Sequence, residues 1–215
     1  KYVADFEALV IGHPQDNFLS KKTSATKSMF SSLKGISSSP DISEKIGLER
    51  DAALAENLNI RYHADQITTK KGIEALRLSK KRNNNITAGT SIHHFIFNEL
   101  DVGNYRTFFK LKPPLRCNSD REALIEALKD GTIDNICSMH TPQDEESKRL
   151  PYEEAAFGAV GLETILPASL SLYHNKDLQL YKIFQLLAFN PAKILRKSLG
   201  TLTKSSPADL IIFDL

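Results

Sequence analysis

Short apolar runs alternate with longer stretches of helical period, and this alternation constrains the fold more than any other feature of the chain. Four runs, 8–12, 60–64, 86–90 and 133–137, have the length and composition of strands, and residues of helical period lie between them. Strands joined by helices run parallel, because each helix returns the chain to the end from which the strand began. A closed barrel of eight such units needs about 250 residues. We therefore predict an α/β fold whose four visible units form part of a (β/α)8 barrel.

Two motifs predict where helices begin. The sequences Asp41-Ile42-Ser43-Glu44 and Ser119-Asp120-Arg121-Glu122 fit the capping box, in which a cap acceptor is followed three residues later by a carboxylate. They predict helices over about 41–58 and 119–131. The side chains expected to face the core from the first helix are Ile46, Ala53, Leu54 and Leu58.

Helix caps and local composition predict the remaining helices, a loop and a last strand. Thr68 and Thr69 predict a helix that ends near Arg82, and the Ser-rich segment 20–39 predicts a mobile loop with one helical turn. Helices over about 158–174 and 178–188 and a last strand over 208–213 complete the expected elements.

Composition excludes several classes of protein. A net charge of +2 is too small to indicate nucleic-acid binding, and no apolar run reaches the roughly 20 residues of a membrane span. Cys117 and Cys137 do not make a disulfide framework, so a reducing, cytoplasmic location is expected. The chain enters its first strand almost at once, which predicts a fragment that lacks an N-terminal half.

Reactive groups of a parallel barrel lie at the carboxyl ends of its strands. The residues at these ends are His13, Gln66, the pair His93-His94, and Met139. Only the histidines among them are ordinary metal ligands or proton acceptors. A serine nucleophile, Ser91 or Ser138 backed by His94 or His140, and a zinc site at Cys137 and His140 are weaker alternatives, since neither is part of a longer motif.

The segment 137–143, Cys-Ser-Met-His-Thr-Pro-Gln, and the segment 157–167, which begins Phe-Gly-Ala-Val-Gly-Leu-Glu-Thr, resemble the signature of bacterial dihydroorotases. In that family the first segment usually reads Asp-His-Ala-Pro-His. Pro113-Pro114-Leu115-Arg116 and the ending 206–214 also resemble the family. The resemblance implies the C-terminal half of an amidohydrolase barrel over 1–205 and a strand of a small β-domain over 206–215.

The resemblance assigns metal ligands of the family to three positions. His13 keeps a ligand histidine, as a remnant of the site, whereas Gln66 stands in place of a second ligand histidine. Met139 stands where the family has its catalytic aspartate. A neutral amide is a poor zinc ligand and a thioether carries no charge, so no catalytic residue and no cofactor are expected. Zinc is expected only if the enzyme is active.

Family positions that contact substrate are altered as well. Lys112 replaces a substrate-binding Asn, and Gln143 replaces a histidine that contacts a substrate carboxylate. Phe157 and Gly158 match the family and are expected to line the substrate site.

Three functions are consistent with these residues. The leading hypothesis is a catalytically silent dihydroorotase homologue of pyrimidine biosynthesis, which assembles with aspartate transcarbamoylase or with itself. The second is an active zinc dihydroorotase that interconverts N-carbamoyl-L-aspartate and dihydroorotate. The third is a binder of an anionic small molecule through Lys112 and Arg116.

Overall fold

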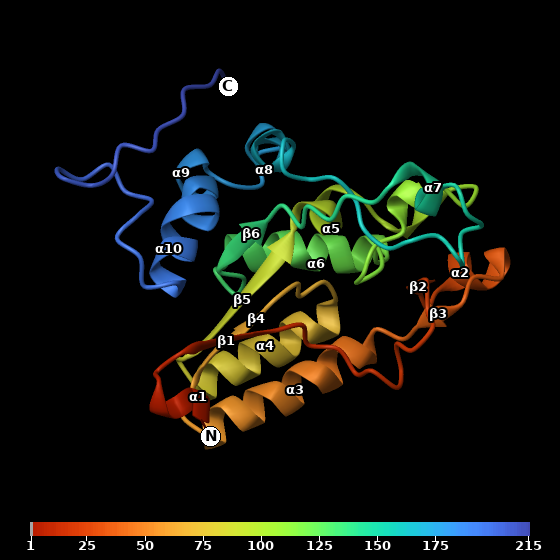
Figure 1. Ribbon diagram of the computed structural model, residues 1–215, viewed down its shortest axis with the longest axis horizontal. Coiled ribbons are helices and arrows are strands. Elements are labelled where there is room, and N and C mark those ends of the chain that lie inside the picture. Colours follow the sequence, from red (N-terminus) through yellow and green to blue (C-terminus); the bar gives the residue numbers. More distant parts are fainter. Residues whose placement is uncertain (1) are drawn as a thin grey trace.

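A parallel sheet of four strands lies at the centre of the computed structural model, which describes residues 2–215 (Figure 1). The strands follow the order β1 (Leu9–Gly12), β4 (Arg61–Ala64), β5 (Ile86–Ser91) and β6 (Asn135–Cys137). All three neighbouring pairs are parallel, as predicted. Strands β1 and β6 form the two edges of the sheet.

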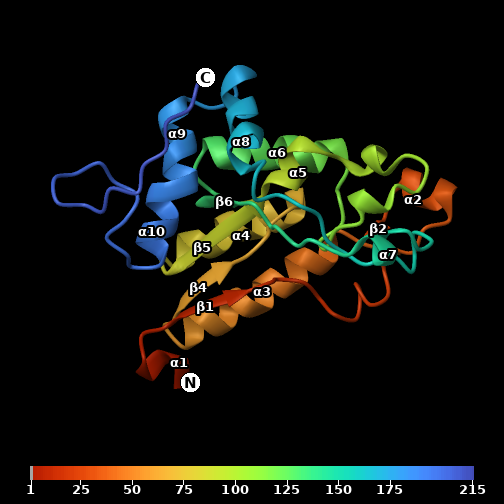
Figure 2. The ribbon, with the colours of Figure 1, turned by 45° about the horizontal axis from the view of Figure 1, so that its top comes forward.

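Helices connect the strands and cover one face of the sheet. The connections contain α3 (Ile42–Asn57), α4 (Lys70–Arg82), α5 (Ile92–Ile96) and α6 (Asn118–Lys129). After β6 come α7 (Glu145–Lys148), α8 (Ile165–His174), α9 (Leu180–Phe184), the π-helical turn η3 (Gln185–Phe189) and α10 (Asn190–Ile194). The short elements are α1 (Tyr2–Asp5), β2 (Ala25–Thr26), α2 (Met29–Lys34), β3 (Ser38–Ser39), η1 (Glu99–Val102) and η2 (Thr107–Phe109). Figure 2 shows the chain after α10 looping outward and returning beside α9, where the Phe213 ring lies 5.8 Å from that of Phe184.

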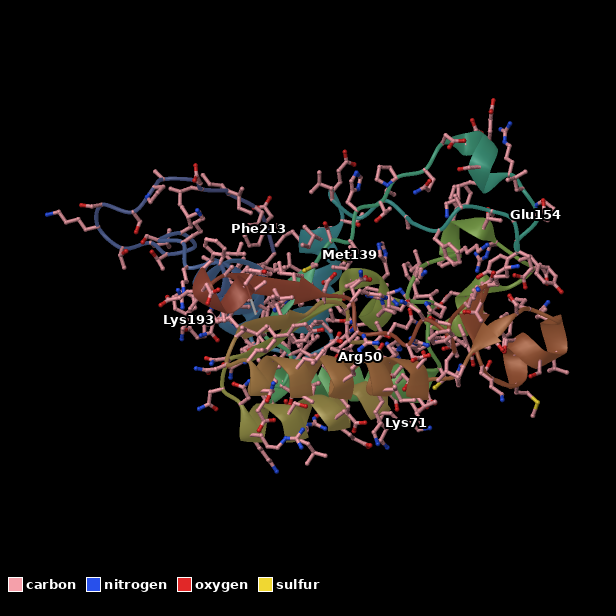
Figure 3. All side chains as sticks on the ribbon, turned by 60° about the horizontal axis from the view of Figure 1, so that its bottom comes forward. Arg50, Lys71, Met139, Glu154, Lys193 and Phe213 are labelled. Carbon is pink, nitrogen blue, oxygen red and sulfur yellow. The ribbon has the colours of Figure 1, made fainter. Side chains whose placement is uncertain are left out.

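The main core lies between the helices and one face of the sheet. Successive side chains of a strand point to opposite faces, and the core face carries Tyr62, Ala64, Ile86, Ala88 and Ile136. They pack against buried helix residues that include Leu48, Leu76, Leu124, Leu128 and Ile183. Each fully buried Leu or Ile contributes about 1.5–3 kcal/mol. The opposite face, here called the inner face, carries Ile11, His63, Thr87, Gly89, Asn135 and Cys137. In Figure 3, Arg50 on α3 and Lys71 on α4 lie on one side of the strands and Met139 lies on the other.

The predicted capping boxes are wrong, although the helices exist. Neither Asp41 nor Cys117, the cap residues of α3 and α6, makes a side-chain capping bond. The carboxylates of Glu44 and Asp120 instead reach the first turn of α4, where Asp120 Oδ1 accepts from the Lys70 backbone N–H at 2.8 Å. The start of a helix has unpaired N–H groups, which favour such carboxylates. Thr69 caps α4 as predicted and accepts from the Gly72 N–H at 3.0 Å.

The predicted buried face of α3 is also wrong. Ile46, Ala53 and Leu54 are exposed, Leu58 is half-buried, and the helix buries Gly47 and Ala52 among its small residues. Small residues let α3 approach its neighbours closely, because a Cβ on Gly47 would lie 2.5 Å from the Gln15 nitrogen. Together with the anchored Glu44, this close approach fixes the rotation of the helix.

The Ser-rich segment 20–39 is more structured than the predicted loop. It contains the expected helical turn as α2, and β2 and β3 pair in parallel. The carboxylate of Glu153 accepts from the Ser24 hydroxyl at 2.6 Å and from the Ser37 N–H at 2.6 Å. These bonds tie the segment to a distant part of the chain.

Two further segments differ from prediction. Helix α8 begins at Ile165 rather than near 158, because Pro167 has no N–H to donate and is tolerated only in a first turn. Residues 208–213 form no strand, since no strand within 2–215 pairs with them. The division into 1–205 and 206–215 stays a prediction.

Candidate functional site

Three predicted positions lie at the carboxyl edge of the sheet, where the parallel strands end together. His13 follows β1, Gln66 lies two residues after β4, and Met139 lies two residues after β6. The backbone φ angles of Gln66 and Met139 are 58° and 44°. Residues other than glycine seldom adopt this left-handed conformation. Such conformations cluster where a structure positions functional groups.

A cavity of about 30 Å³ brings several of the predicted residues together at this edge. Gln66, Lys112, Met139 and Gly158 line it, with Ser91, His93, His94, Leu111, Thr141 and Ala159. His13, Gln143 and Phe157 are not among the lining residues. The cavity is large enough for about one water molecule.

The residues of this chain do not fit a zinc site. Within residues 2–215, no group of three His, Cys, Asp or Glu side chains converges as metal ligands. Gln66 and Met139 offer a neutral amide and a thioether, both poor partners for zinc. His13 is exposed. The Nδ1 atom of His140 accepts from the backbone N–H groups of Gly161 and Leu162, at 3.1 and 3.2 Å, so this nitrogen is occupied.

The predicted substrate-binding positions have different environments. Lys112 is exposed and lines the cavity, whereas Gln143 is exposed and does not line it. The ring of Phe157 lies 4.5 Å from Nζ of Lys110. Gly158 has a φ of 126°, and a Cβ there would lie 2.4 Å from the Thr141 carbonyl oxygen, so this position requires glycine.

Arg116 is not available to an anionic ligand, contrary to the third hypothesis. Its side chain is 2% exposed and donates to the hydroxyls of Thr68 at 2.9 Å and Thr26 at 2.7 Å. Its guanidinium also lies 3.5 Å from the Glu44 carboxylate. The residue joins the segment 20–39 to the start of α4.

Burial lowers the pKa of the histidines on the inner face and on α5. His63 Nδ1 lies 2.8 Å from the Thr87 hydroxyl, and burial lowers the pKa of His63. Burial, assisted by the Arg116 charge, lowers the pKa of His94 to about 3, which makes it a weak base. Ser91 lies 3.3 Å from His94 Nδ1 but is fully buried, so the pair cannot act as an accessible nucleophile and base.

His93, one of the residues predicted to lie at the strand ends, also contributes to the cavity. It is 7% exposed, lines the cavity, and its Nε2 has no hydrogen-bond partner. Burial lowers the pKa of His93. His93 lies two residues after the end of β5, the kind of position at which the sequence predicted reactive groups.

Comparisons with known proteins agree with this geometry. The model of the amidohydrolase family matches residues 20–215. A dihydroorotase of Anaplasma phagocytophilum is 39% identical over 216 residues, which cover all of this chain and 48% of the relative. A dihydroorotase of Halalkalibacterium halodurans is 36% identical over 216 residues, which cover all of this chain and 50% of the relative. The chain thus spans about half the length of these relatives.

Solved structures show the same fold. The L-hydantoinase of Arthrobacter aurescens superposes with a TM-score of 0.85 at 22% identity, over 96% of this chain and 48% of that protein. The dihydropyrimidinase of Brevibacillus agri gives a TM-score of 0.81 at 17% identity, over 95% of this chain and 47% of that protein.

Proposed function

Because the chain belongs to the amidohydrolase family, we propose that it is a catalytically silent homologue of the dihydroorotases with a role in assembly. The observation that carries the proposal is the pair Gln66 and Met139, which line one cavity at the carboxyl edge where the resemblance places a ligand and the catalytic base. The thioether of Met139 cannot accept a proton from water at neutral pH. The amide of Gln66 is likewise neither a base nor a good zinc ligand.

The test is dihydroorotate hydrolysis by the purified protein, with and without added zinc, together with metal analysis. We expect no turnover above the buffer rate and no stoichiometric zinc. Turnover that a chelator removes would overturn the proposal and would favour the active zinc enzyme instead. That alternative is supported by the names of the relatives, which are called dihydroorotases.

The hypothesis that the chain binds an anionic small molecule through Lys112 and Arg116 has little support. Arg116 is buried and paired, so Lys112 is the only one of the two proposed cations that lines the cavity. Thermal shift with N-carbamoyl-L-aspartate checks it. We expect no stabilisation, and stabilisation that Lys112→Ala removes would restore the hypothesis.

We also propose a partner for this assembly. Aspartate transcarbamoylase is the candidate that the family resemblance implies, and a cytoplasmic location goes with it. Across residues 2–215, the structure has no helix that is both long and apolar enough to span a membrane. Mixing purified aspartate transcarbamoylase with this chain should give one co-eluting complex in size-exclusion chromatography. Separate elution at micromolar concentrations would contradict this partner.

A further inference from the structure

A cleft of about 390 Å³ lies beside α10 and shares no lining residue with the cavity at the carboxyl edge. In Figure 3, Lys193, which lines this cleft, and Glu154 lie toward opposite ends of the molecule, with Met139 between them. Three basic, four hydroxyl and two apolar side chains line the cleft, and no acidic side chain of residues 2–215 does so. A cleft of this size is large enough for a small molecule.

The basic side chains come from the last turn of α10 and the residues just after it. The chain leaves the helix through a turn in which the Lys197 N–H donates to the Ala192 carbonyl at 2.8 Å. Arg196, within this turn, has a φ of 53°, which residues other than glycine seldom adopt. The turn also occupies the Ala192 carbonyl, one of the helix-end groups that would otherwise repel an anion.

Two of the three positive charges in the cleft have no counter-ion. Arg196 forms an ion pair with Glu7 at 3.2 Å. Among residues 2–215, no carboxylate oxygen lies within 4.0 Å of the ammonium group of Lys193 or of Lys197. A ligand that fits this cleft should therefore carry about two negative charges.

Three hydroxyl groups of the cleft lie within hydrogen-bond distance of one another. Thr201 Oγ1 lies 3.1 Å from Thr203 Oγ1 and 3.0 Å from Ser206 Oγ, and the last two atoms are 2.7 Å apart. Because each hydroxyl rotates freely about its C–O bond, all three can turn their protons toward a ligand with several acceptor oxygens. Hydrogen bonds to an anionic oxygen are stronger than those between neutral hydroxyls.

The loop that carries these hydroxyls packs directly on the helical segment η3. Gly200 has a φ of 71°, and a Cβ there would lie 2.7 Å from the Ala188 carbonyl oxygen, so this position requires glycine. Phe189 and Leu199 form the apolar part of the cleft and are 42% and 44% exposed. They offer a contact for an uncharged part of a ligand.

We propose that this cleft binds a small phosphate monoester, whose uncharged part contacts Phe189 and Leu199. At neutral pH a phosphate monoester carries a charge of about −1.5 to −2 and three acceptor oxygens. Lys193 and Lys197 match the charge, and the three hydroxyls match the oxygens. A carboxylate has one charge and two oxygens, so it satisfies fewer of these groups.

Binding in this cleft is independent of catalysis at the carboxyl edge, so the activity assay and the following tests fail separately. Isothermal titration calorimetry should show that phenyl phosphate binds. Its affinity should rise between about pH 5 and pH 7, because the phosphate loses its second proton near pH 6. Benzenesulfonate keeps a single charge over this range, so its weaker binding should not change.

Substitutions in the cleft test the roles of its charges and hydroxyls. Lys193→Gln combined with Lys197→Gln should weaken the binding of phenyl phosphate about tenfold or more, since a hydrogen bond to a charged group contributes at least that factor. Lys204→Gln is the matched control, because Lys204 is an exposed lysine of the same loop that does not line the cleft. Thr203→Val removes one hydroxyl with little change of shape and should weaken binding about threefold to tenfold.

Three results would contradict this site. The first is the absence of phenyl phosphate binding to the unaltered chain at millimolar concentrations. The second is an equal loss of affinity in Lys204→Gln, because the attraction would then come from overall charge rather than from the cleft. The third is co-sedimentation with vesicles that contain phosphatidic acid, without binding of phenyl phosphate, which would assign the phosphate to a lipid surface.

Discussion

The buried carboxylate of Glu44 is the group whose removal we expect to destabilise this protein most. Its Oε1 atom accepts from the N–H groups of Thr68 at 3.0 Å and Thr69 at 2.8 Å, and from the Thr69 hydroxyl at 2.8 Å. Its Oε2 atom accepts from the Thr68 hydroxyl at 2.5 Å and lies 3.5 Å from Arg116. Both charged side chains are about 2–3% exposed.

Glu44→Ala would leave the charge of Arg116 buried without its counter-ion and the first N–H groups of α4 without an acceptor. Breaking a buried pair in this way costs about 3–5 kcal/mol. For a chain of 150–250 residues, 1 kcal/mol corresponds to about 2–4 °C, so Tm should fall by about 6–20 °C. Glu44→Gln should cost less, since its single carbonyl oxygen can keep the three bonds made by Oε1.

Urea unfolding followed by far-UV circular dichroism measures the change. The control is Glu49→Ala on the same helix, because Glu49 is 47% exposed and its 3.8 Å pair with Lys45 should contribute less than about 0.5 kcal/mol. If Glu44→Ala changed the free energy of unfolding by no more than Glu49→Ala does, the role given to this carboxylate would be wrong.

Three other outcomes follow from the same contacts. In an exposed helix, Gly→Ala stabilises by about 1 kcal/mol. Gly72→Ala should instead destabilise this protein, because the new Cβ would lie 2.2 Å from Glu44 Oε1. Urea unfolding shows whether the free energy of unfolding rises or falls. The pKa of His94 lies below that of the unfolded chain, so stability should fall as pH drops below about 6.5, by about 1.4 kcal/mol at pH 5.5. His94→Gln should remove that part of the pH dependence, and an unchanged profile would refute it. The double variant Gln66→His, Met139→Asp should bind zinc more tightly in calorimetry than the unaltered chain, whereas Met29→Asp, at an exposed methionine, should not.

The strands were predictable because each combines a short apolar run with flanking polar residues, and the parallel order followed from the helices between them. The positions of Gln66 and Met139 followed from the same argument, since strand ends lie together in any parallel sheet. What the sequence did not reveal was which helix a carboxylate would cap. A capping box is a local pattern, and Glu44 and Asp120 satisfy a helix that lies next to theirs only in the folded chain.

The burial of Arg116 was unpredictable for a related reason. An arginine after Pro-Pro-Leu reads as a surface cation, and its partners Thr26 and Glu44 are 90 and 72 positions away. Apolar periodicity also predicted the wrong buried face for α3, because Ile46 and Leu54 are exposed. The helix instead buries Leu48 together with the small residues Gly47, Ala52 and Ala55, and small residues give a weak signal in a search for large apolar side chains.

The core of this fold is separate from the carboxyl edge where Gln66 and Met139 lie. The side chains of the main core lie on the helix-covered face of the strands, whereas Gln66 and Met139 line a cavity beyond the strand ends. Replacing a ligand there removes no buried apolar area from the core, so it leaves the largest stabilising contribution unchanged. The left-handed backbone at both positions is retained although neither residue favours it. Packing of the sheet is therefore enough to hold the backbone at these two positions, whichever side chains they carry.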